Sequence, residues 1–190
     1  SALATLSAGG GWDMPETVYS GVMRATQLNW RTGLRKVAIV LGDAPPLDPE
    51  PFTGYTASSV AAVAYAVDPV EIYGVDVGLL ASREFTELVT ASGGAIYQAN
   101  GGNVADSFVT ALQSSLSKPF VWLQGPYIGR VGSTLTLDAR ASYSMDSEIV
   151  RYEWDFDGDG TYDAITADPM VAHRFMTEAL GVVGVRVTDA

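Results

Sequence analysis

The chain has 190 residues, of which 47% are hydrophobic and 17% charged, a composition typical of a globular protein with a sizeable core rather than of a disordered chain. Its formal net charge of −11 argues against nucleic acid and anionic membranes as partners, because phosphate binding needs clustered Lys and Arg, and cations are better candidates. The absence of cysteine and the single histidine, His173, exclude disulfides, thiol catalysis and cysteine-ligated zinc.

The first half of the chain alternates helix and strand signals. Asp13 precedes Pro15 and Glu16, so it is expected to cap a helix that runs to about Leu28. The continuous apolar run KVAIVLGD at residues 36–43 predicts a central parallel strand that is covered on both faces.

The same alternation continues to about residue 117. The pattern predicts a helix at 57–67, a strand at 71–77, a third helix capped by Ser82 and ended by Gly93 and Gly94, and a short strand at 95–98. Asn103 then opens a last helix, with Val104, Phe108, Leu112 and Leu116 at helical spacing. Helices that alternate with strands in this way predict a parallel α/β sheet with right-handed crossovers.

The longest apolar run, residues 60–67, is far shorter than the ~20 residues of a membrane span, so we expect no membrane insertion.

From Pro119 onward the pattern changes to period two. The segments TLTLDA, VRYEW and VGVRVTD alternate apolar and polar residues, and turn clusters separate them. This half is predicted to be a small antiparallel β-sandwich. We therefore expect two domains, residues 1–117 and 118–190, joined with almost no linker, so that they touch.

Residues in the first half resemble the C-terminal part of a von Willebrand factor type A (vWA) domain. The resemblance rests on GGGWDMPETVYSGV, KVAIVLGDAPP and DPVEIYGVDV, followed by a terminal helix. It implies a partial doubly wound parallel sheet.

The family's metal site needs a D-x-S-x-S loop, a threonine, and an aspartate that ends the central strand. Asp43 matches that aspartate, Trp12 stands at the threonine position, and D-x-S-x-S is absent. Asp43 is then either a vestigial metal ligand or a cap of the loop that follows, and we expect weak or no cation binding in this half.

The resemblance also implies that the chain begins inside a domain. The strand at 36–41 would normally have a neighbour on each side, and the residues that would form one neighbour precede Ser1. An unpaired apolar edge invites another strand. We therefore expect either self-association through this edge, or a missing N-terminal segment that belongs to the protein but lies outside the chain.

The second half resembles a PKD (polycystic kidney disease) domain. The residues that carry this resemblance are TLTLDARASYSMDSEIVRYEWDFDGDG, then His173 and Phe175, then VRVTD. It implies an Ig-like β-sandwich. The predicted fold class is therefore α/β plus all-β: a partial doubly wound parallel sheet followed by a small antiparallel Ig-like β-sandwich.

The stretch WDFDGDGTYDA at 154–164 is a candidate Ca²⁺ loop. The expected ligands follow a D-x-D-x-D-G spacing, with carboxylates at positions 1, 3, 5 and 9 and a carbonyl at position 7: Asp155, Asp157, Asp159, Thr161 and Asp163. Crowded carboxylates repel one another unless a cation shares the space. Position 12 is Thr166 rather than a bidentate glutamate, so we expect modest affinity. The alternative is a solvated turn with no metal.

Both resemblances imply a noncatalytic binding or adhesion segment of a larger secreted or cell-surface bacterial protein. Its expected partner is an extracellular protein or polysaccharide. The alternative is a pair of accessory domains of a secreted hydrolase or protease whose catalytic module lies outside this chain. Glu148 and Glu153 could be imagined as an acid/base pair, but nothing in the sequence shows that they converge. We therefore expect no enzyme.

Overall fold

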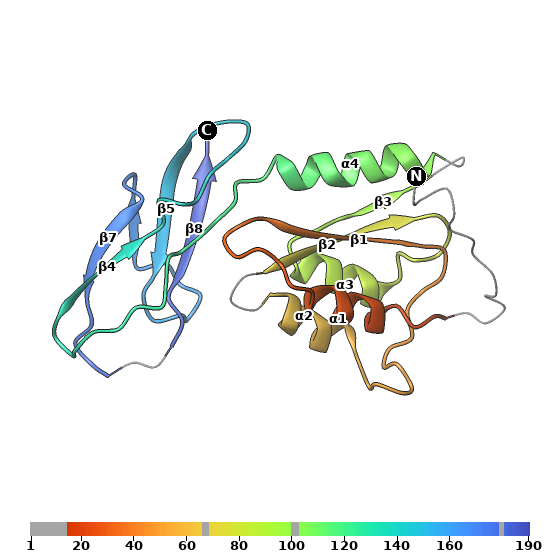
Figure 1. Ribbon diagram of the computed structural model, residues 1–190, viewed down its shortest axis with the longest axis horizontal. Coiled ribbons are helices and arrows are strands. Elements are labelled where there is room, and N and C mark those ends of the chain that lie inside the picture. The colour runs from red at the N-terminus through yellow and green to blue at the C-terminus, as the bar shows by residue number, and fades with distance from the viewer. Residues whose placement is uncertain (1–14, 66–68, 100–102, 179–180) are drawn as a thin grey trace. The chain divides into compact units, whose positions relative to one another are not determined.

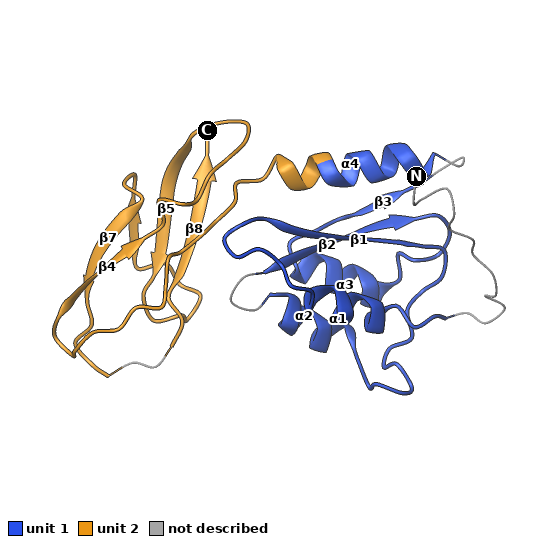
Figure 2. Cartoon of the chain, viewed as in Figure 1, with its two compact units in different colours: residues 1–112 blue, residues 113–190 orange. Residues whose placement is uncertain are grey.

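The computed structural model describes residues 15–65, 69–99, 103–178 and 181–190 (Figure 1). The chain divides into two compact units, residues 1–112 and 113–190 (Figure 2). The division falls inside helix α4 (Val104–Leu116). Because this helix is continuous across the division, the domain boundary after residue 117 stays a prediction.

The first unit is a three-stranded parallel sheet with helices on both faces. Its strands are β1 (Lys36–Gly42), β2 (Val70–Asp76) and β3 (Ile96–Gln98), in the spatial order β1-β2-β3. Helices α1 (Tyr19–Thr26), α2 (Ala57–Ala64) and α3 (Arg83–Ala91) cover one face, and α4 covers the other (Figure 1). The predicted parallel α/β architecture is confirmed.

The position of β1 differs from the prediction of a central strand. Among the residues that the structure describes, β1 pairs only with β2 and therefore lies at an edge of the sheet. The continuous apolar run reports that both faces of a strand are covered. It carries no information about which strands lie beside it. Among the described residues, the edge position of β1 agrees instead with the expectation from the vWA resemblance that one side of this strand is unpaired.

Local signals set the starts of α2 and α3. Thr56 Oγ1 accepts the Ser59 N–H at 3.2 Å while Ser59 Oγ accepts the Thr56 N–H at 2.9 Å, a capping box. Ser82 Oγ accepts the Phe85 N–H at 3.2 Å, which confirms the predicted cap of α3. Asp13, the predicted cap of the first helix, lies outside the described residues.

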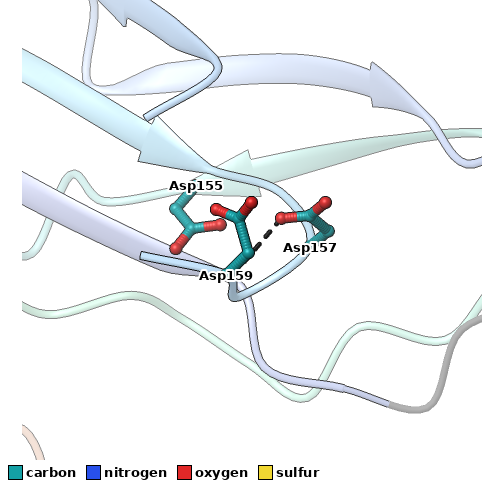
Figure 3. Close-up of side chains that lie close together, drawn as sticks. All are labelled: Asp155, Asp157 and Asp159. Carbon is teal, nitrogen blue, oxygen red and sulfur yellow. Dashed lines mark hydrogen bonds between the residues drawn. The ribbon is translucent and has the colours of Figure 1, made fainter. Parts of the chain in front are cut away.

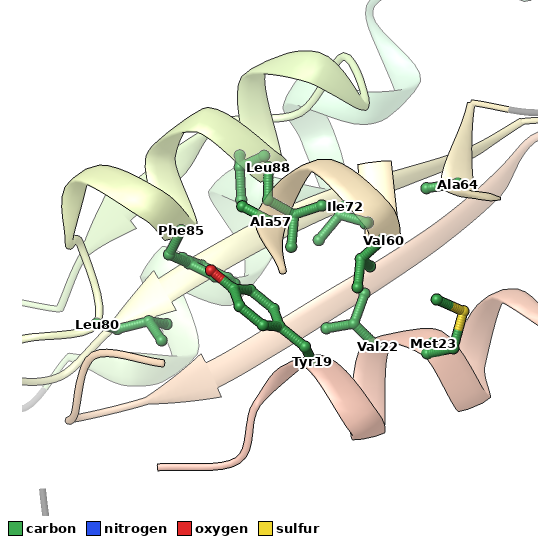
Figure 4. Packing of buried hydrophobic residues seen from close by; sticks show 11 residues of the cluster. Tyr19, Val22, Met23, Ala57, Val60, Ala64, Ile72, Leu80, Phe85 and Leu88 are labelled. Carbon is green, nitrogen blue, oxygen red and sulfur yellow. The ribbon is translucent and has the colours of Figure 1, made fainter. Parts of the chain in front are cut away.

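A buried cluster between the sheet and helices α1 to α3 forms the main core of this unit (Figure 4). The largest fully buried side chains in it are Tyr19, Ile72, Leu80, Phe85 and Leu88. A second cluster lies between the sheet and α4, and it includes Tyr73, Val75 and Ala111.

The packed face of α4 also differs from the prediction. Ala111 and Ser115 are fully buried, whereas Phe108, Leu112 and Leu116 are 46%, 41% and 44% exposed. The sheet presents large side chains on this side, such as Tyr73, so small helix residues bring the backbones together. Of the four residues that the sequence places at helical spacing, Val104 packs against this cluster and the other three are exposed.

The second unit is an antiparallel sandwich of two sheets. Its strands are β4 (Thr134–Asp138), β5 (Ile149–Asp155), β6 (Ala164–Thr166), β7 (Met170–Arg174) and β8 (Gly184–Asp189). One sheet has the order β4-β7 and the other β6-β5-β8. Trp154 and Leu137 are fully buried in the cluster between the sheets, and the Trp154 indole N–H donates to Thr166 Oγ1 at 2.9 Å. The three strands predicted from period-two alternation are confirmed as β4, β5 and β8.

Candidate metal centre

The acidic loop, residues 155–163, connects β5 to β6. Hydrogen bonds close the loop at its neck, where the two strands meet. Trp154 at the end of β5 lies opposite Ala164 at the start of β6. The Asp163 N–H donates to the Trp154 carbonyl at 2.7 Å, and the Phe156 N–H donates to Asp163 Oδ2 at 2.7 Å. These bonds hold the two ends of the loop at a fixed separation.

Asp155 organises the inside of the loop. Its side chain is buried, with 6% of the residue exposed. Oδ1 accepts the Gly158 N–H at 2.7 Å, and Oδ2 accepts the Gly160 N–H at 2.8 Å. Burial by itself would raise the pKa of Asp155, but these backbone N–H groups favour the charged form and hold the pKa below its ordinary value. Asp155 is therefore an ionised carboxylate, and each of its oxygens accepts a backbone N–H of the loop.

Two exposed carboxylates lie beside Asp155 (Figure 3). Asp157 Oδ1 accepts the Asp159 N–H at 3.3 Å, and Asp159 Oδ1 accepts the Thr161 N–H at 2.6 Å. One oxygen from each of the three aspartates lies within 4.8 Å of the others. This is the one cluster of three or more candidate metal-ligating side chains within the described parts of the chain. Carboxylates at this separation repel one another, and a divalent cation between them would relieve the repulsion.

Two glycines allow the loop to turn. Gly158 and Gly160 have φ values of +74° and +87°, a region that residues with a Cβ rarely adopt. A Cβ on Gly158 would lie 2.4 Å from the Val182 carbonyl oxygen, whereas a Cβ on Gly160 would meet nothing within 4 Å. Close packing against Val182 therefore adds a second requirement for glycine at position 158 only.

The structure brings together three of the five predicted ligands. The Asp163 carboxylate binds the Phe156 N–H at the neck instead of joining the cluster. Thr161 is linked to the cluster through its N–H, and its carbonyl stays a predicted ligand. Thr166, at position 12, is engaged elsewhere: its Oγ1 accepts from Trp154 and donates to the Asp168 carbonyl at 2.7 Å.

Asp43 lies at the carboxyl end of β1 and is exposed. Its carbonyl accepts the Leu79 N–H at 2.8 Å. Asp43 belongs to no cluster of three candidate ligands in the described ranges, and Trp12 lies outside them. Its role as a vestigial ligand stays a prediction.

Sequence reasoning missed Asp76, the buried carboxylate at the end of β2. Asp76 is 2% exposed and accepts four hydrogen bonds, from the N–H groups of Gly78, Leu80 and Ala81 and from Gln98 Nε2. Burial would raise its pKa, but these donors hold the pKa below its ordinary value. All four acceptor directions are used, so Asp76 fixes the loop after β2. The sequence Asp76-Val-Gly78, an aspartate two residues before a glycine after a strand, is the signal that could have identified it.

The carboxylates considered as an acid/base pair do not form one. Glu153 is 4% exposed and binds Arg151 Nη2 and Arg186 Nε, each at 2.7 Å. The hydrogen bond from Arg186 is the main reason that the pKa of Glu153 is lowered, which is the opposite of what a general acid needs. Glu148 is exposed and precedes β5. Five residues of extended chain separate the two, roughly 16 Å.

His173 is a packing residue in the described structure. Its ring stacks on Phe156 with centroids 3.9 Å apart and meets Phe175 edge-on at 4.6 Å. Phe156 is the second residue of the acidic loop, so this stack connects the loop to β7.

The fold of the second unit agrees with a comparison to known families. Residues 117–190 match the family model of the PKD domain. This match supports the PKD part of the sequence resemblance and its Ig-like sandwich. PKD domains are a noncatalytic family, typically extracellular adhesion or accessory modules. The match does not extend to residues 1–116, so the vWA resemblance and the bacterial origin stay predictions.

A search of curated proteins found no match to the chain. Among the described residues, every helix is too short or too polar to cross a membrane.

Proposed function

We propose that this chain is a noncatalytic binding or adhesion segment of a larger secreted or cell-surface bacterial protein, and that its PKD domain carries a Ca²⁺ loop. The observation that carries the proposal is the cluster of Asp155, Asp157 and Asp159 on a loop with a closed neck. The ligand of the whole segment is an extracellular protein or a polysaccharide, in keeping with the typical role of PKD domains. The first unit is a vWA-like portion of the same protein.

The available ligands favour a modest Ca²⁺ affinity. Ca²⁺ takes 6 to 8 oxygen ligands, and the cluster offers three carboxylates, with the carbonyl of Thr161 and water to complete the shell. Position 12 is Thr166, which has no carboxylate and whose hydroxyl is engaged elsewhere, so no bidentate carboxylate closes the site at this position. We expect a Kd of about 10⁻⁴ to 10⁻³ M, the range of extracellular modules.

A bound cation would stiffen both sheets of the sandwich. Phe156 stacks on His173 of β7, and the Arg186 guanidinium of β8 lies 4.3 Å from the Tyr162 ring centroid. These two contacts connect one loop to a strand in each sheet. Neutralising the loop's carboxylates therefore stabilises the module as a whole.

Thermal unfolding with and without Ca²⁺ tests this proposal. At a Kd of 10⁻⁴ to 10⁻³ M, 1 mM Ca²⁺ stabilises the folded domain by roughly 0.4 to 1.4 kcal/mol. For a domain of 60 to 100 residues this raises the midpoint of unfolding by about 2 to 11 °C. The reference sample contains a chelator, and Mg²⁺ at equal concentration tests selectivity.

Two matched variants of the full chain locate the site. Asp157→Ala removes an exposed cluster carboxylate and is expected to abolish the Ca²⁺-dependent shift, with the Ca²⁺-free midpoint unchanged or slightly raised. Asp146→Ala removes an exposed carboxylate outside the loop and is expected to keep the full shift. An equal shift in both variants would show that Ca²⁺ binds elsewhere, and no shift in the parent chain would identify the loop as a solvated turn.

A further inference from the structure

The acidic loop contains both Asp-Gly steps of the chain, Asp157-Gly158 and Asp159-Gly160. An aspartate can react with its own main chain, because the nitrogen of the next residue and the carbon of the side-chain carboxyl can close a five-membered ring. A following glycine favours this reaction, since it has no side chain to hinder the approach and its backbone turns freely. Both aspartates are exposed, so water can reach the cyclic product.

The reaction isomerises aspartate without changing its mass. The glycine nitrogen attacks the carboxyl carbon and forms a C–N bond, and one carboxyl oxygen leaves as water with the N–H proton and a proton from solvent. Water then opens the cyclic imide and a proton is released. Cleavage of the new bond restores aspartate, whereas cleavage of the original main-chain bond gives isoaspartate, in which the chain continues through the side-chain carbon. Water is therefore the one reactant that the loop must meet.

Asp155 holds the two reacting nitrogens almost equally. Its Oδ1 accepts the Gly158 N–H at 2.7 Å, and its Oδ2 accepts the Gly160 N–H at 2.8 Å. Reaction at either step requires that the loop opens enough to release this bond. The hydrogen bonds to Asp155 therefore do not decide which step reacts first.

The space around the two glycines differs. A Cβ on Gly158 would lie 2.4 Å from the Val182 carbonyl oxygen, so the Cα of Gly158 is packed against that backbone. A Cβ on Gly160 would meet nothing within 4 Å. Ring closure turns the peptide plane between the aspartate and the glycine, and the glycine must move with it. Gly160 has the space for this movement, whereas Gly158 is restrained.

The hydrogen bonds to the two reacting carboxyl groups also differ. Asp159 Oδ1 accepts the Thr161 N–H at 2.6 Å, whereas Asp157 Oδ1 accepts the Asp159 N–H at 3.3 Å. The carboxyl oxygen gains negative charge when the nitrogen attacks the carbon beside it, and a closer N–H donor stabilises that charge more. Packing and hydrogen bonding therefore both favour the Asp159-Gly160 step.

We propose that Asp159 is a modification site, at which the folded loop directs spontaneous isomerisation to isoaspartate in preference to Asp157. This inference does not depend on whether Ca²⁺ binds. The product lengthens the main chain by one carbon and displaces one carboxylate of the cluster. Weaker Ca²⁺ binding by the modified loop is a consequence that rests on the proposed function.

Peptide mapping of the full chain, incubated at neutral pH in a chelator, tests the proposal. Chromatography separates the isoaspartyl peptide from the aspartyl peptide of equal mass, and fragmentation in the mass spectrometer locates the modified residue. In urea no fold distinguishes the two steps, so we expect comparable conversion at both. In the folded chain we expect Asp159 to convert about fivefold faster than Asp157, the ratio that an extra barrier of about 1 kcal/mol at Gly158 produces.

Two matched variants check the assignment. Asp159→Glu keeps the charge but places the carboxyl one carbon farther from the main chain, so a five-membered ring cannot form and the isomer at this position is expected to disappear. Asp157→Glu is expected to keep the full rate at Asp159. Equal conversion of the two aspartates in the folded chain, or faster conversion of Asp157, overturns the proposal. It is also overturned if neither aspartate converts in the time that the urea sample needs to react.

Discussion

The two glycines of the acidic loop should respond differently to the same substitution. Gly160 and Gly158 both have positive φ values. Alanine is strained in this left-handed region, so substitution at either position is expected to lower the unfolding free energy by about 1 to 2 kcal/mol. At Gly160 this is the whole cost, because the space around its Cβ is open.

Gly158→Ala carries a further cost. Its Cβ would lie 2.4 Å from the Val182 carbonyl oxygen, well inside contact distance, so the backbone before β8 must move. Overpacking of this kind typically costs about 1 to 3 kcal/mol. The unfolding free energy is therefore expected to fall by about 1 to 2 kcal/mol in Gly160→Ala and by about 2 to 5 kcal/mol in Gly158→Ala.

Urea unfolding of the full chain, in the presence of a chelator, measures both values. The NMR signal of the Trp154 indole N–H reports on the second unit, because Trp154 is fully buried there and bonded to Thr166. Gly160→Asn serves as a control, because asparagine tolerates positive φ better than alanine and should lose less stability. Equal losses in the two alanine variants would refute the reasoning, since they would mean that the Val182 carbonyl does not pack against Gly158.

Two more predictions concern the buried carboxylates. Asp76→Asn replaces one carboxylate oxygen, which accepts two of the four hydrogen bonds, by an NH₂ group, so the unfolding free energy of the first unit should fall in urea titrations by roughly 1 to 3 kcal/mol for each donor left without an acceptor. Because the pKa of Asp155 is lowered in the folded state, the stability it contributes is present above its unfolded pKa of about 3.9 and is lost as pH falls below that value. The melting temperature of the second unit, measured in chelator, should therefore drop between about pH 5 and pH 3, and Asp155→Asn should flatten this drop; an unchanged acid profile in the variant would contradict it.

The sequence predicted elements better than it predicted contacts. Ser82 was found because capping is a local interaction, satisfied within three residues. The packed face of α4 was not, because the large side chains of the facing sheet decide that Ala111 rather than Leu112 is buried. The edge position of β1 also depends on distant strands, so the apolar run did not indicate it, and only the family resemblance did.

In the candidate metal centre too, the sequence predicted local spacing better than it predicted long-range contacts. The D-x-D-x-D spacing predicted the cluster of Asp155, Asp157 and Asp159, because a tight loop can bring only alternate side chains to one side. Asp163 belongs to the same pattern by count, but β5–β6 pairing places it at the neck, where the Phe156 N–H needs an acceptor. The spacing of aspartates in the sequence does not predict how the flanking strands pair, and this pairing decides where Asp163 lies.

The structure also separates the carboxylates that hold the loop from those that would hold the cation. Asp155 binds two backbone N–H groups and is buried, so its loss changes the fold of the loop whether or not Ca²⁺ binds. Asp157 and Asp159 are exposed and each accepts one local N–H, so their negative charge contributes little to the loop except repulsion. A bound cation, as proposed, would turn this repulsion into attraction. With a Kd of about 10⁻⁴ to 10⁻³ M the site would fill only where free Ca²⁺ is near millimolar, as it is around extracellular modules. The proposed function thus makes stability of the module depend on its surroundings through the two exposed aspartates.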